Sequence, residues 1–274
     1  MRASLLTMSA DSISKALKQV NERITASLNS RIQVCNYYKS LKLYFVYALK
    51  QNANCVQRVR LVAVSKTKPI QSILEAYACG QRHFGENYIN ELLEKSNDAQ
   101  ITENCPEIKW HFIGRIQSNK INKLLSVPNL FVVETVSSEN VAESLNRSLE
   151  KMNQNQENEK LKVMVQINTS DEQNKNGVQP KQASSLVQFI LEKCSRLQFT
   201  GIMTIGALDR NPSDGPNPDF QRLVECKSEI MQRLQLKDEM ELSMGMSNDF
   251  EEAITLGSTN VRIGSTIFGV RDYH

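Results

Sequence analysis

Lys66 is the residue of this chain whose type and position most suggest covalent chemistry. It follows the short apolar run Leu61–Ser65, which is typical of a buried β-strand. If that strand belongs to a barrel of parallel strands, its carboxyl end opens into the ligand-binding mouth. An amine held there, partly out of water, is a good nucleophile toward an aldehyde. Taken alone, Lys66 is better explained as a lysine at the end of a strand whose amine simply extends into solvent. Lys68 is a second amine nearby, and because Pro69 follows it we expect it to face away.

Small and hydroxylic residues occur at the ends of two late strand candidates, Glu241–Met244 and Val261–Gly264, and directly after them. In barrels of eight β/α units, phosphate sites commonly form after strands seven and eight, where backbone amides at helix starts face the anion. Glycines let the backbone approach closely, and hydroxyls can donate hydrogen bonds. The residues expected to surround a phosphate are Ser243, Gly245, Ser247, Gly264, Ser265 and Thr266. Ser247 is also suited to simple helix capping, which does not exclude a role at a phosphate.

Arg262 lies inside the last strand candidate, two residues before Gly264 and on the same side of the strand. A charged side chain in a central strand is costly unless it has a partner. Two partners fit: the ring nitrogen of a bound ligand, and a neighbouring carboxylate such as Glu241. An amine, a phosphate site and this arginine together suit an aldehyde that carries a phosphate on an aromatic ring.

These residues must be positioned by an alternation of strands and helices that begins at Leu61. Short apolar, β-rich runs are each followed by a turn and an amphipathic helical stretch. The expected strands are Leu61–Ser65, Arg82–Phe84, Trp110–Ile113, Leu130–Glu134, Val163–Asn168, Phe199–Met203, Glu241–Met244 and Val261–Gly264. The expected helices are Ile70–Cys79, Glu86–Lys95, Ile116–Leu125, Ser137–Lys151, Pro180–Lys193, Phe220–Leu236 and Asp249–Leu256. This order predicts an α/β fold with a single (β/α)8 TIM barrel, and a doubly wound open sheet is the alternative.

A helix precedes the barrel, because apolar residues recur on one helical face near the N-terminus. The residues of this face are Ile13, Leu17, Val20, Ile24 and Leu28. We therefore expect a helix at 1–30 that packs on the barrel, an atypical segment at 31–58, and the ligand-binding barrel at 59–274. The segment 31–58 is apolar and β-prone, and fits either an extra helix or strand beneath the barrel or a disordered insert. Because it enters the first strand from its amino end, it should leave the ligand site untouched.

Composition excludes several classes of protein. The 33 Lys and Arg residues nearly balance the 30 Asp and Glu residues, and they are scattered, so we expect no nucleic-acid partner. No apolar run is long enough to cross a membrane. The six cysteines show no C-x-x-C spacing and no histidine at metal-ligand spacing, which favours reduced thiols and no metal. We expect a cytoplasmic protein; Arg2 without a nearby acid makes a mitochondrial presequence the second choice.

Five motifs in order resemble the pyridoxal phosphate homeostasis proteins. The motifs are AVSKTKP at Ala63–Pro69, FGENY at Phe84–Tyr88, WHFIG at Trp110–Gly114, LSMGMS at Leu242–Ser247 and VRIGSTIFG at Val261–Gly269. The resemblance covers the first helix and nearly everything from Arg60 onward, whereas the connection between them is longer than the family's. It implies a barrel like the N-terminal domain of alanine racemase, which is fold type III among proteins that bind pyridoxal phosphate.

The resemblance also implies roles for individual residues. Pyridoxal 5'-phosphate would be the cofactor, held as a Schiff base on Lys66, with Arg262 at the pyridine nitrogen and Asn87 in the pocket. The phosphate would lie among Ser243, Ser247, Gly264, Ser265 and Thr266. The implied function is intracellular vitamin B6 homeostasis: binding pyridoxal phosphate, limiting its free level and delivering it to apo-enzymes that depend on it.

Physical chemistry favours a carrier over an enzyme. A protonated Arg262 leaves the pyridine nitrogen unprotonated, which weakens the ring as an electron sink. Racemisation requires an acid–base group on each face of the substrate, and alanine racemase takes its second group, a tyrosine, from a separate domain. This chain ends at His274 directly after the expected barrel, and Tyr88 and His111 fit packing roles better than catalysis. We therefore expect no catalytic residues, in a monomer or weak dimer. A fold type III amino-acid racemase and an unrelated phosphosugar enzyme are the alternatives.

Overall fold

The strands of this protein close into a single parallel barrel. The computed structural model describes residues 10–40, 58–152, 160–170, 172, 176–207, 210 and 215–270. The strands are β1 (Arg60–Val64), β2 (His83–Glu86), β3 (Lys109–Phe112), β4 (Leu130–Val136), β5 (Leu161–Gln166), β6 (Leu197–Met203), β7 (Glu241–Ser243) and β8 (Asn260–Ile263). Each strand pairs with the next, and β8 pairs with β1 in parallel, Val261 opposite Leu61. This closure confirms the (β/α)8 barrel and excludes the open sheet.

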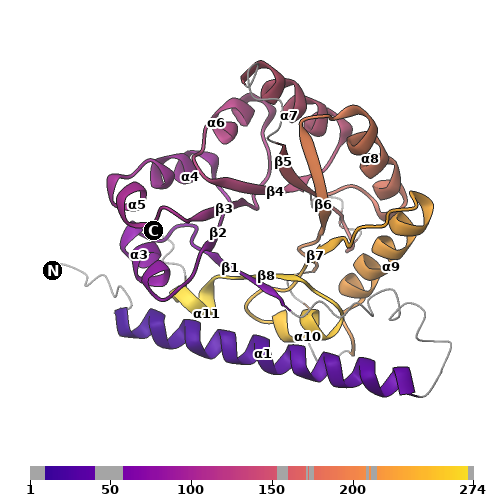
Figure 1. Ribbon diagram of the computed structural model, residues 1–274, viewed down its shortest axis with the longest axis horizontal. Coiled ribbons are helices and arrows are strands. Elements are labelled where there is room, and N and C mark those ends of the chain that lie inside the picture. The colour runs from indigo at the N-terminus through magenta and orange to yellow at the C-terminus, as the bar shows by residue number, and fades with distance from the viewer. Residues whose placement is uncertain are drawn as a thin grey trace.

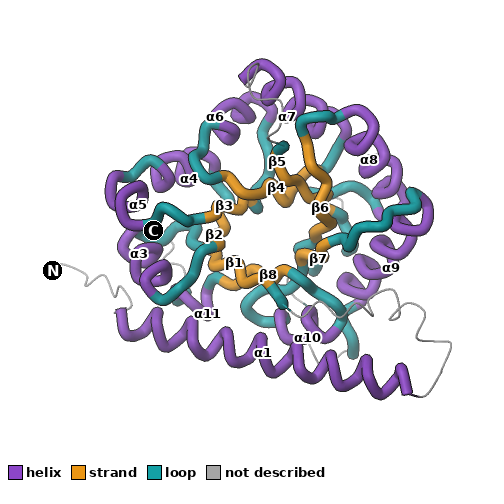
Figure 2. The backbone as a smooth tube through the Cα atoms, in the orientation of Figure 1, coloured by secondary structure: helices purple, strands orange, loops and turns teal. Residues whose placement is uncertain are grey.

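Helices surround this barrel, as Figure 2 shows from one end. They are α3 (Ile70–Ala78), α4 (Ile89–Ser96), α5 (Ala99–Asn104), α6 (Ile121–Leu125), α7 (Glu139–Met152), α8 (Pro180–Lys193), α9 (Pro218–Arg233), α10 (Phe250–Thr255) and α11 (Ser265–Phe268), with a 3-10 turn, η2 (Ser118–Lys120), before α6. The sequence prediction did not include α5 and α11. Both are too short to show a helical repeat of apolar residues, and α5 is marked chiefly by Asp98, whose side chain accepts a hydrogen bond from the Gln100 amide.

The long helix α1 (Ala10–Ser40) lies across the outside of the barrel, next to α3, α10 and α11 (Figure 1). Its predicted apolar face is buried. The helix continues ten residues past the expected end at residue 30, so the first part of the segment 31–58 is helical. Arg31 explains part of this extension, because its buried side chain donates to the Ser258 carbonyl. Residues 41–57 of that segment lie outside the described residues.

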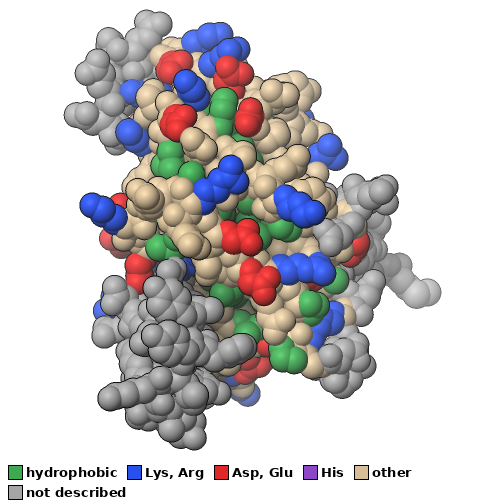
Figure 3. Space-filling model, turned by 90° about the vertical axis from the view of Figure 1, so that its right-hand side faces the viewer, with side chains coloured by type: hydrophobic (Ala, Val, Ile, Leu, Met, Phe, Trp, Pro, Cys, Tyr) green, Lys and Arg blue, Asp and Glu red, His purple; other side chains and the backbone are tan. Residues whose placement is uncertain are grey.

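Apolar side chains fill the layer between strands and helices, whereas the barrel interior also holds polar ones. The helices contribute Ile73, Leu92, Leu124, Leu145 and Phe220, all fully buried, to one continuous core. On the face shown in Figure 3, Lys and Arg side chains are interspersed with Asp and Glu. None of the described helices is long and apolar enough to cross a membrane.

Candidate functional site

A cavity of about 480 Å³ opens where β1, β2 and β6 to β8 end. Its volume falls within the range of about 300–1,000 Å³ that is typical of small-molecule sites. The carboxyl ends of barrel strands are where enzymes of this fold bind their ligands. Most of the predicted site residues line the cavity, and these are Lys66, Asn87, Ser247, Arg262, Gly264 and Ser265. Ser243 and Thr266 are not in the lining.

Lys66 lies two residues after the end of β1, and the backbone on both sides of it is held by one partly buried cluster. The Lys95 amine donates to the Ser65 carbonyl at 2.8 Å, to Glu86 at 2.7 Å and to Glu91 at 2.6 Å. The Glu91 carboxylate also accepts from the Thr67 amide at 2.6 Å. Thus the residue before Lys66 and the residue after it are both bound to groups of the same cluster, which we call the Lys95 cluster (Ser65, Thr67, Glu86, Glu91 and Lys95).

The Lys95 cluster holds a strained turn. Thr67 has a φ of 64°, a left-handed conformation that is unfavourable for a β-branched residue. Such a conformation persists only where surrounding contacts enforce it, and the Glu91 carboxylate supplies one of them. Burial raises the pKa of Glu86, an effect that the Lys95 charge opposes. Sequence reasoning missed this cluster; the spacing of Glu91 and Lys95 on one helix was the available signal.

The Lys68 side chain does not point in the direction predicted from the sequence. It was expected to face away from the site, but it lines the cavity. Its amine donates to the Val270 carbonyl at 3.0 Å, which draws the side chain toward the chain segment after α11. The following proline constrains the backbone of Lys68 but not the direction of this long side chain.

Another wall of the cavity is formed by the loop after β7 and the start of α11. Gly245 turns the chain there with a φ of 96°, and an added Cβ would lie 2.6 Å from the Ala253 Cβ. The Ser247 hydroxyl accepts from the amides of Gly264 at 3.3 Å and Thr266 at 3.4 Å. Ser247 therefore ties the two loops predicted to hold a phosphate to each other.

This wall also offers hydrogen-bond donors to a ligand. Within the described part of the chain, the amides of Ser247, Asn248 and Ser265 have no acceptor. Convergent backbone amides of this kind favour an anion. Gly264 brings the backbone close to β1, because a Cβ there would lie only 3.3 Å from the Val64 carbonyl oxygen.

Ser243 lies inside the barrel rather than beside this wall. Its hydroxyl donates to Glu134 at 2.5 Å and accepts from Arg262 at 2.6 Å, so both of its hydrogen-bonding roles are taken within the protein. It is fully buried and outside the cavity lining. The sequence analysis grouped Ser243 with Ser247 at the end of strand seven, but Ser243 belongs to β7 and its side chain is buried in the barrel interior.

Arg262 closes the floor of the cavity and is only 3% exposed. One terminal nitrogen of its guanidinium donates to Ser243, and the other donates to the Thr204 carbonyl at 2.7 Å. Burial lowers the pKa of Arg262 from its usual value, while the charges of Glu134 and Asp249 oppose that shift. Glu241, the carboxylate considered from the sequence, pairs with Arg60 instead. Among the described residues, only Ser243 and the Thr204 carbonyl accept hydrogen bonds from Arg262, so its other guanidinium donors can serve a ligand.

Asn87 lines the cavity and also carries a polar atom that is unpaired within the described part of the chain. Its side-chain oxygen is buried, and the described residues provide it with no hydrogen-bond partner. An unpaired buried polar atom is costly, so a ligand that satisfied it would be favoured. The residue is held by close packing against Gly114, where a Cβ would lie 1.8 Å from the Asn87 carbonyl oxygen. This contact explains why the FGENY and WHFIG motifs occur together.

The walls between these polar groups are apolar. Val64, Ile113, Met203 and Ile205 line the cavity and suit the faces of an aromatic ring. Asp249, which the sequence reading assigned only to a helix start, also lines it; its carboxylate accepts from the Met246 amide at 2.6 Å, and burial raises its pKa. An amine, a group of amides, an arginine and an unpaired amide oxygen around an apolar slot fit pyridoxal phosphate.

Neither acid–base candidate from the sequence lines this cavity. Tyr88 is 55% exposed and lies just before α4. His111 is buried in the barrel interior, where it contacts Glu134 and His83. The buried position of His111 agrees with a structural role, whereas Tyr88 is on the surface and not packed as expected.

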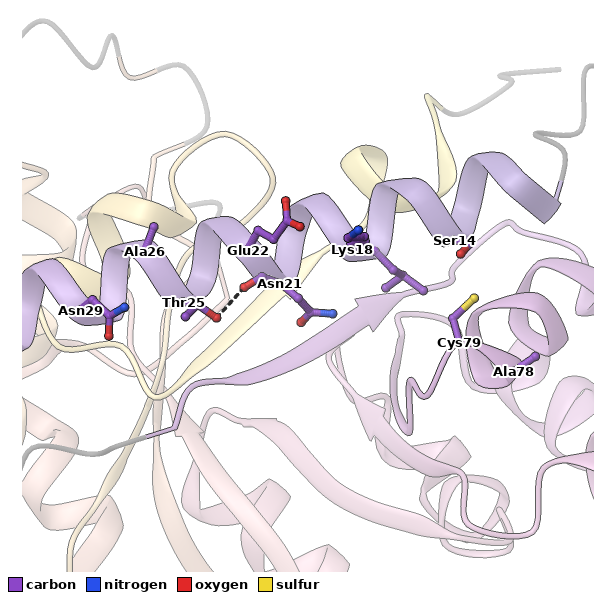
Figure 4. A pocket seen from close by; sticks show the side chains of 10 residues that line it. Ser14, Lys18, Asn21, Glu22, Thr25, Ala26, Asn29, Ala78 and Cys79 are labelled. Atoms are coloured by element: carbon purple, nitrogen blue, oxygen red, sulfur yellow. Dashed lines mark hydrogen bonds between the residues drawn. The ribbon is translucent and has the colours of Figure 1, made fainter.

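A larger hollow lies between α1 and α3 (Figure 4). Its walls come mainly from one polar face of α1, which carries Ser14, Lys18, Asn21 and Glu22. None of the predicted site residues borders it. The cavity at the barrel mouth is therefore the candidate site.

Comparisons with known proteins agree with this site. The profile of the family "Alanine racemase, N-terminal domain" matches residues 46–272. The human pyridoxal phosphate homeostasis protein is 54% identical over 215 residues, which cover 78% of this chain and 77% of that protein. The structure of PipY from Synechococcus elongatus with pyridoxal phosphate bound is 33% identical, with a TM-score of 0.66 over 77% of this chain and 92% of that one.

An alanine racemase from Clostridium difficile is 17% identical with a TM-score of 0.59, over 82% of this chain and 57% of that one. That likeness shows a common fold alone. The profile match, the human relative and the barrel with its lysine at the end of β1 lead to one conclusion. The chain belongs to the alanine racemase N-terminal-domain family and, within it, to the pyridoxal phosphate homeostasis proteins.

Proposed function

We propose that this protein binds pyridoxal phosphate through Lys66 and acts in intracellular vitamin B6 homeostasis, as a carrier or buffer of the cofactor. The observation that carries the proposal is that one cavity is lined by Lys66, Asn87, Ser247 and Arg262 together. The PipY structure with pyridoxal phosphate bound supports it, since that protein shares the fold at 33% identity.

Each part of the site has a distinct task. Bound pyridoxal phosphate supplies an electrophilic aldehyde on an aromatic ring. Lys66 would hold the cofactor through its amine, as a Schiff base with that aldehyde. The amides of Ser247 and Ser265 donate to the phosphate, and Arg262 donates to the ring nitrogen. The Lys95 cluster keeps the backbone around Lys66 in place, so that the amine faces the cavity.

The carrier role is supported by what lines the cavity. Its described titratable residues are Lys66, Lys68, Asp249 and Arg262. Lys68 and Asp249 already have hydrogen-bond partners in the protein, which leaves no evident pair of acid–base groups for the two faces of an amino-acid substrate. The C=N bond is reversible, so cofactor held in this way can be released to apo-enzymes. We place this exchange in the cytoplasm, in a monomer or weak dimer.

Absorbance spectroscopy tests the proposal. The purified protein incubated with pyridoxal phosphate should turn yellow, and Lys66→Ala should abolish the visible band. Lys181→Ala, which removes an exposed lysine on α8, is the matched control and should keep the band. A colourless wild-type protein would refute the proposal.

The racemase alternative has its own test. The loaded protein is incubated with L-alanine and other amino acids in deuterated water. A carrier leaves the optical rotation and the α-hydrogen unchanged. Loss of rotation together with incorporation of α-deuterium would show a fold type III racemase instead.

A further inference from the structure

A continuous chain of polar side chains runs through the barrel interior and ends at Arg262 in the cavity. Its members are His83, His111, Glu134, Ser243 and Arg262, from strands β2, β3, β4, β7 and β8. The ring nitrogens of the two histidines are 2.8 Å apart, and the second histidine is 2.6 Å from the glutamate. The glutamate is 2.5 Å from the serine, and the serine is 2.6 Å from the arginine. We call this set the interior relay.

Glu134 is the charged centre of the interior relay. Burial would raise its pKa, but the hydrogen bond from His111 and the charges of His111 and Arg262 outweigh burial and lower the pKa to about 2. An ionised carboxylate only accepts hydrogen bonds. Glu134 accepts them from His111, from Ser243 and from the Asn260 amide group at 3.0 Å. The direction of every hydrogen bond to Glu134 is therefore fixed.

The orientation of Ser243 follows from this. Its one proton is donated to Glu134, so its lone pairs are left for the Arg262 guanidinium. The Thr204 carbonyl accepts from the other terminal nitrogen of Arg262. Because the guanidinium is planar, two fixed terminal nitrogens determine where its other donors point. Arg262 is also a buried charge, and Glu134 is its nearest countercharge in the relay.

We propose that Glu134 and Ser243 are positioning residues for Arg262: they hold the guanidinium so that it can donate to the ring nitrogen of the bound cofactor. This inference rests on the proposed function, because it assumes pyridoxal phosphate in the cavity. Neither residue lines the cavity, so both act only through Arg262.

A probe without the ring nitrogen isolates this effect. We would measure dissociation constants for pyridoxal 5'-phosphate and for 1-deazapyridoxal 5'-phosphate, in which a CH group replaces the ring nitrogen. The two molecules share the aldehyde and the phosphate, so a loss at those groups changes both affinities equally. A hydrogen bond from a charged donor is worth enough for wild type to prefer pyridoxal phosphate by about tenfold or more.

Three variants complete the experiment. Glu134→Gln removes the countercharge with little change in shape, and Ser243→Ala removes the bridging hydroxyl. Glu241→Gln is the matched control, because it removes a carboxylate that pairs with Arg60 at the other end of β7 and does not contact Arg262. We expect the first two variants to lose most of the wild-type preference and the control to keep it.

The outcomes separate the inference from the function beneath it. No binding of pyridoxal phosphate by wild type would refute the proposed function and this inference with it. Normal binding without any preference for the ring nitrogen would overturn the inference alone. A preference that survives in Glu134→Gln and Ser243→Ala, or equal weakening for both probes, would also overturn it. If Glu134→Gln does not fold, the result for Ser243→Ala alone tests the inference, because that substitution deletes a single oxygen and is less disruptive to folding.

Discussion

Replacing Lys95 with methionine should both destabilise the protein and slow its reaction with pyridoxal phosphate. Lys95 is 6% exposed and its ammonium makes three hydrogen bonds, one to the Ser65 carbonyl and two to carboxylates. Methionine keeps most of the volume but removes the charge. The buried Glu86 then loses its cation, and the turn that carries Lys66 loses one of its anchors.

The expected loss is large because a buried charge is left uncompensated. Breaking a buried ion pair by removing one partner costs about 3–5 kcal/mol. Whole domains are stable by only about 5–15 kcal/mol, so the change in the free energy of unfolding should be easy to measure. Part of this loss of stability is avoided when Glu86 takes up a proton, because the buried carboxyl group is then neutral.

Because Glu86 can take up this proton, the loss of stability in Lys95→Met should depend on pH, and the direction of that dependence follows from the pKa of Glu86. Burial raises the pKa of Glu86 in the folded protein, and without Lys95 nothing of comparable size opposes this shift. The folded variant then binds a proton that the unfolded chain has released, so its stability falls as pH rises. We therefore expect Lys95→Met to be less destabilised at pH 5 than at pH 8.

Urea unfolding followed by the fluorescence of Trp110, the single tryptophan, measures the stability, and the growth of the visible band measures the reaction at Lys66. Lys181→Met changes an exposed lysine and should stay within about 0.5 kcal/mol of wild type. The reasoning would be refuted if Lys95→Met matched this control in stability and matched wild type in its rate of reaction.

Three further predictions concern the cavity and the interior relay. Asn87→Ala should weaken pyridoxal phosphate binding by about tenfold in equilibrium dialysis, because Asn87 lines the cavity, and it should not lower the melting temperature of the apo-protein, because the described residues give its side-chain oxygen no partner to lose; a lower melting temperature would contradict this. Ser247→Ala should weaken pyridoxal phosphate binding by about tenfold, because the lost hydroxyl ties together the two loops whose amides face the phosphate, but it should leave the binding of pyridoxal, which lacks the phosphate, unchanged; equal effects on both would contradict it. Burial and the neighbouring charges of His111, Arg60 and Lys109 lower the pKa of His83 from 6.5 to about 3, so the unfolded chain binds the extra proton and stability should fall as pH drops from about 6.5 toward 3. His83→Gln should lessen that fall in urea midpoints, and an unchanged pH profile would refute the assignment.

The barrel was predictable because its signals are local. Each strand is a short apolar run, and each is followed by a helical repeat, so the order of elements can be read along the chain. Lys66 and Arg262 could be assigned to the site because Lys66 follows one such strand and Arg262 lies within another. Both residues also belong to motifs that resemble those of the family. The sequence does not show whether a residue near a strand end faces the cavity or the barrel interior, and this is why Ser243 was grouped with Ser247.

The interior relay was not predictable, because its members come from five different strands. No local spacing connects His83 with Glu134 or with Ser243, and only the closed barrel brings them into contact. The Lys95 cluster is an intermediate case. The i, i+4 pair of Glu91 and Lys95 is visible in the sequence, but its contact with the turn at Thr67 depends on how α4 packs against the end of β1.

Borohydride reduction followed by peptide mass mapping tests the role of Lys66 most directly. The protein is loaded with pyridoxal phosphate and reduced, which turns a C=N bond into a stable secondary amine. We predict one labelled peptide, modified at Lys66, and no label on it in Lys66→Ala. A label on Lys68 instead, or no label at all on a protein that has bound the cofactor, would contradict the assignment of Lys66.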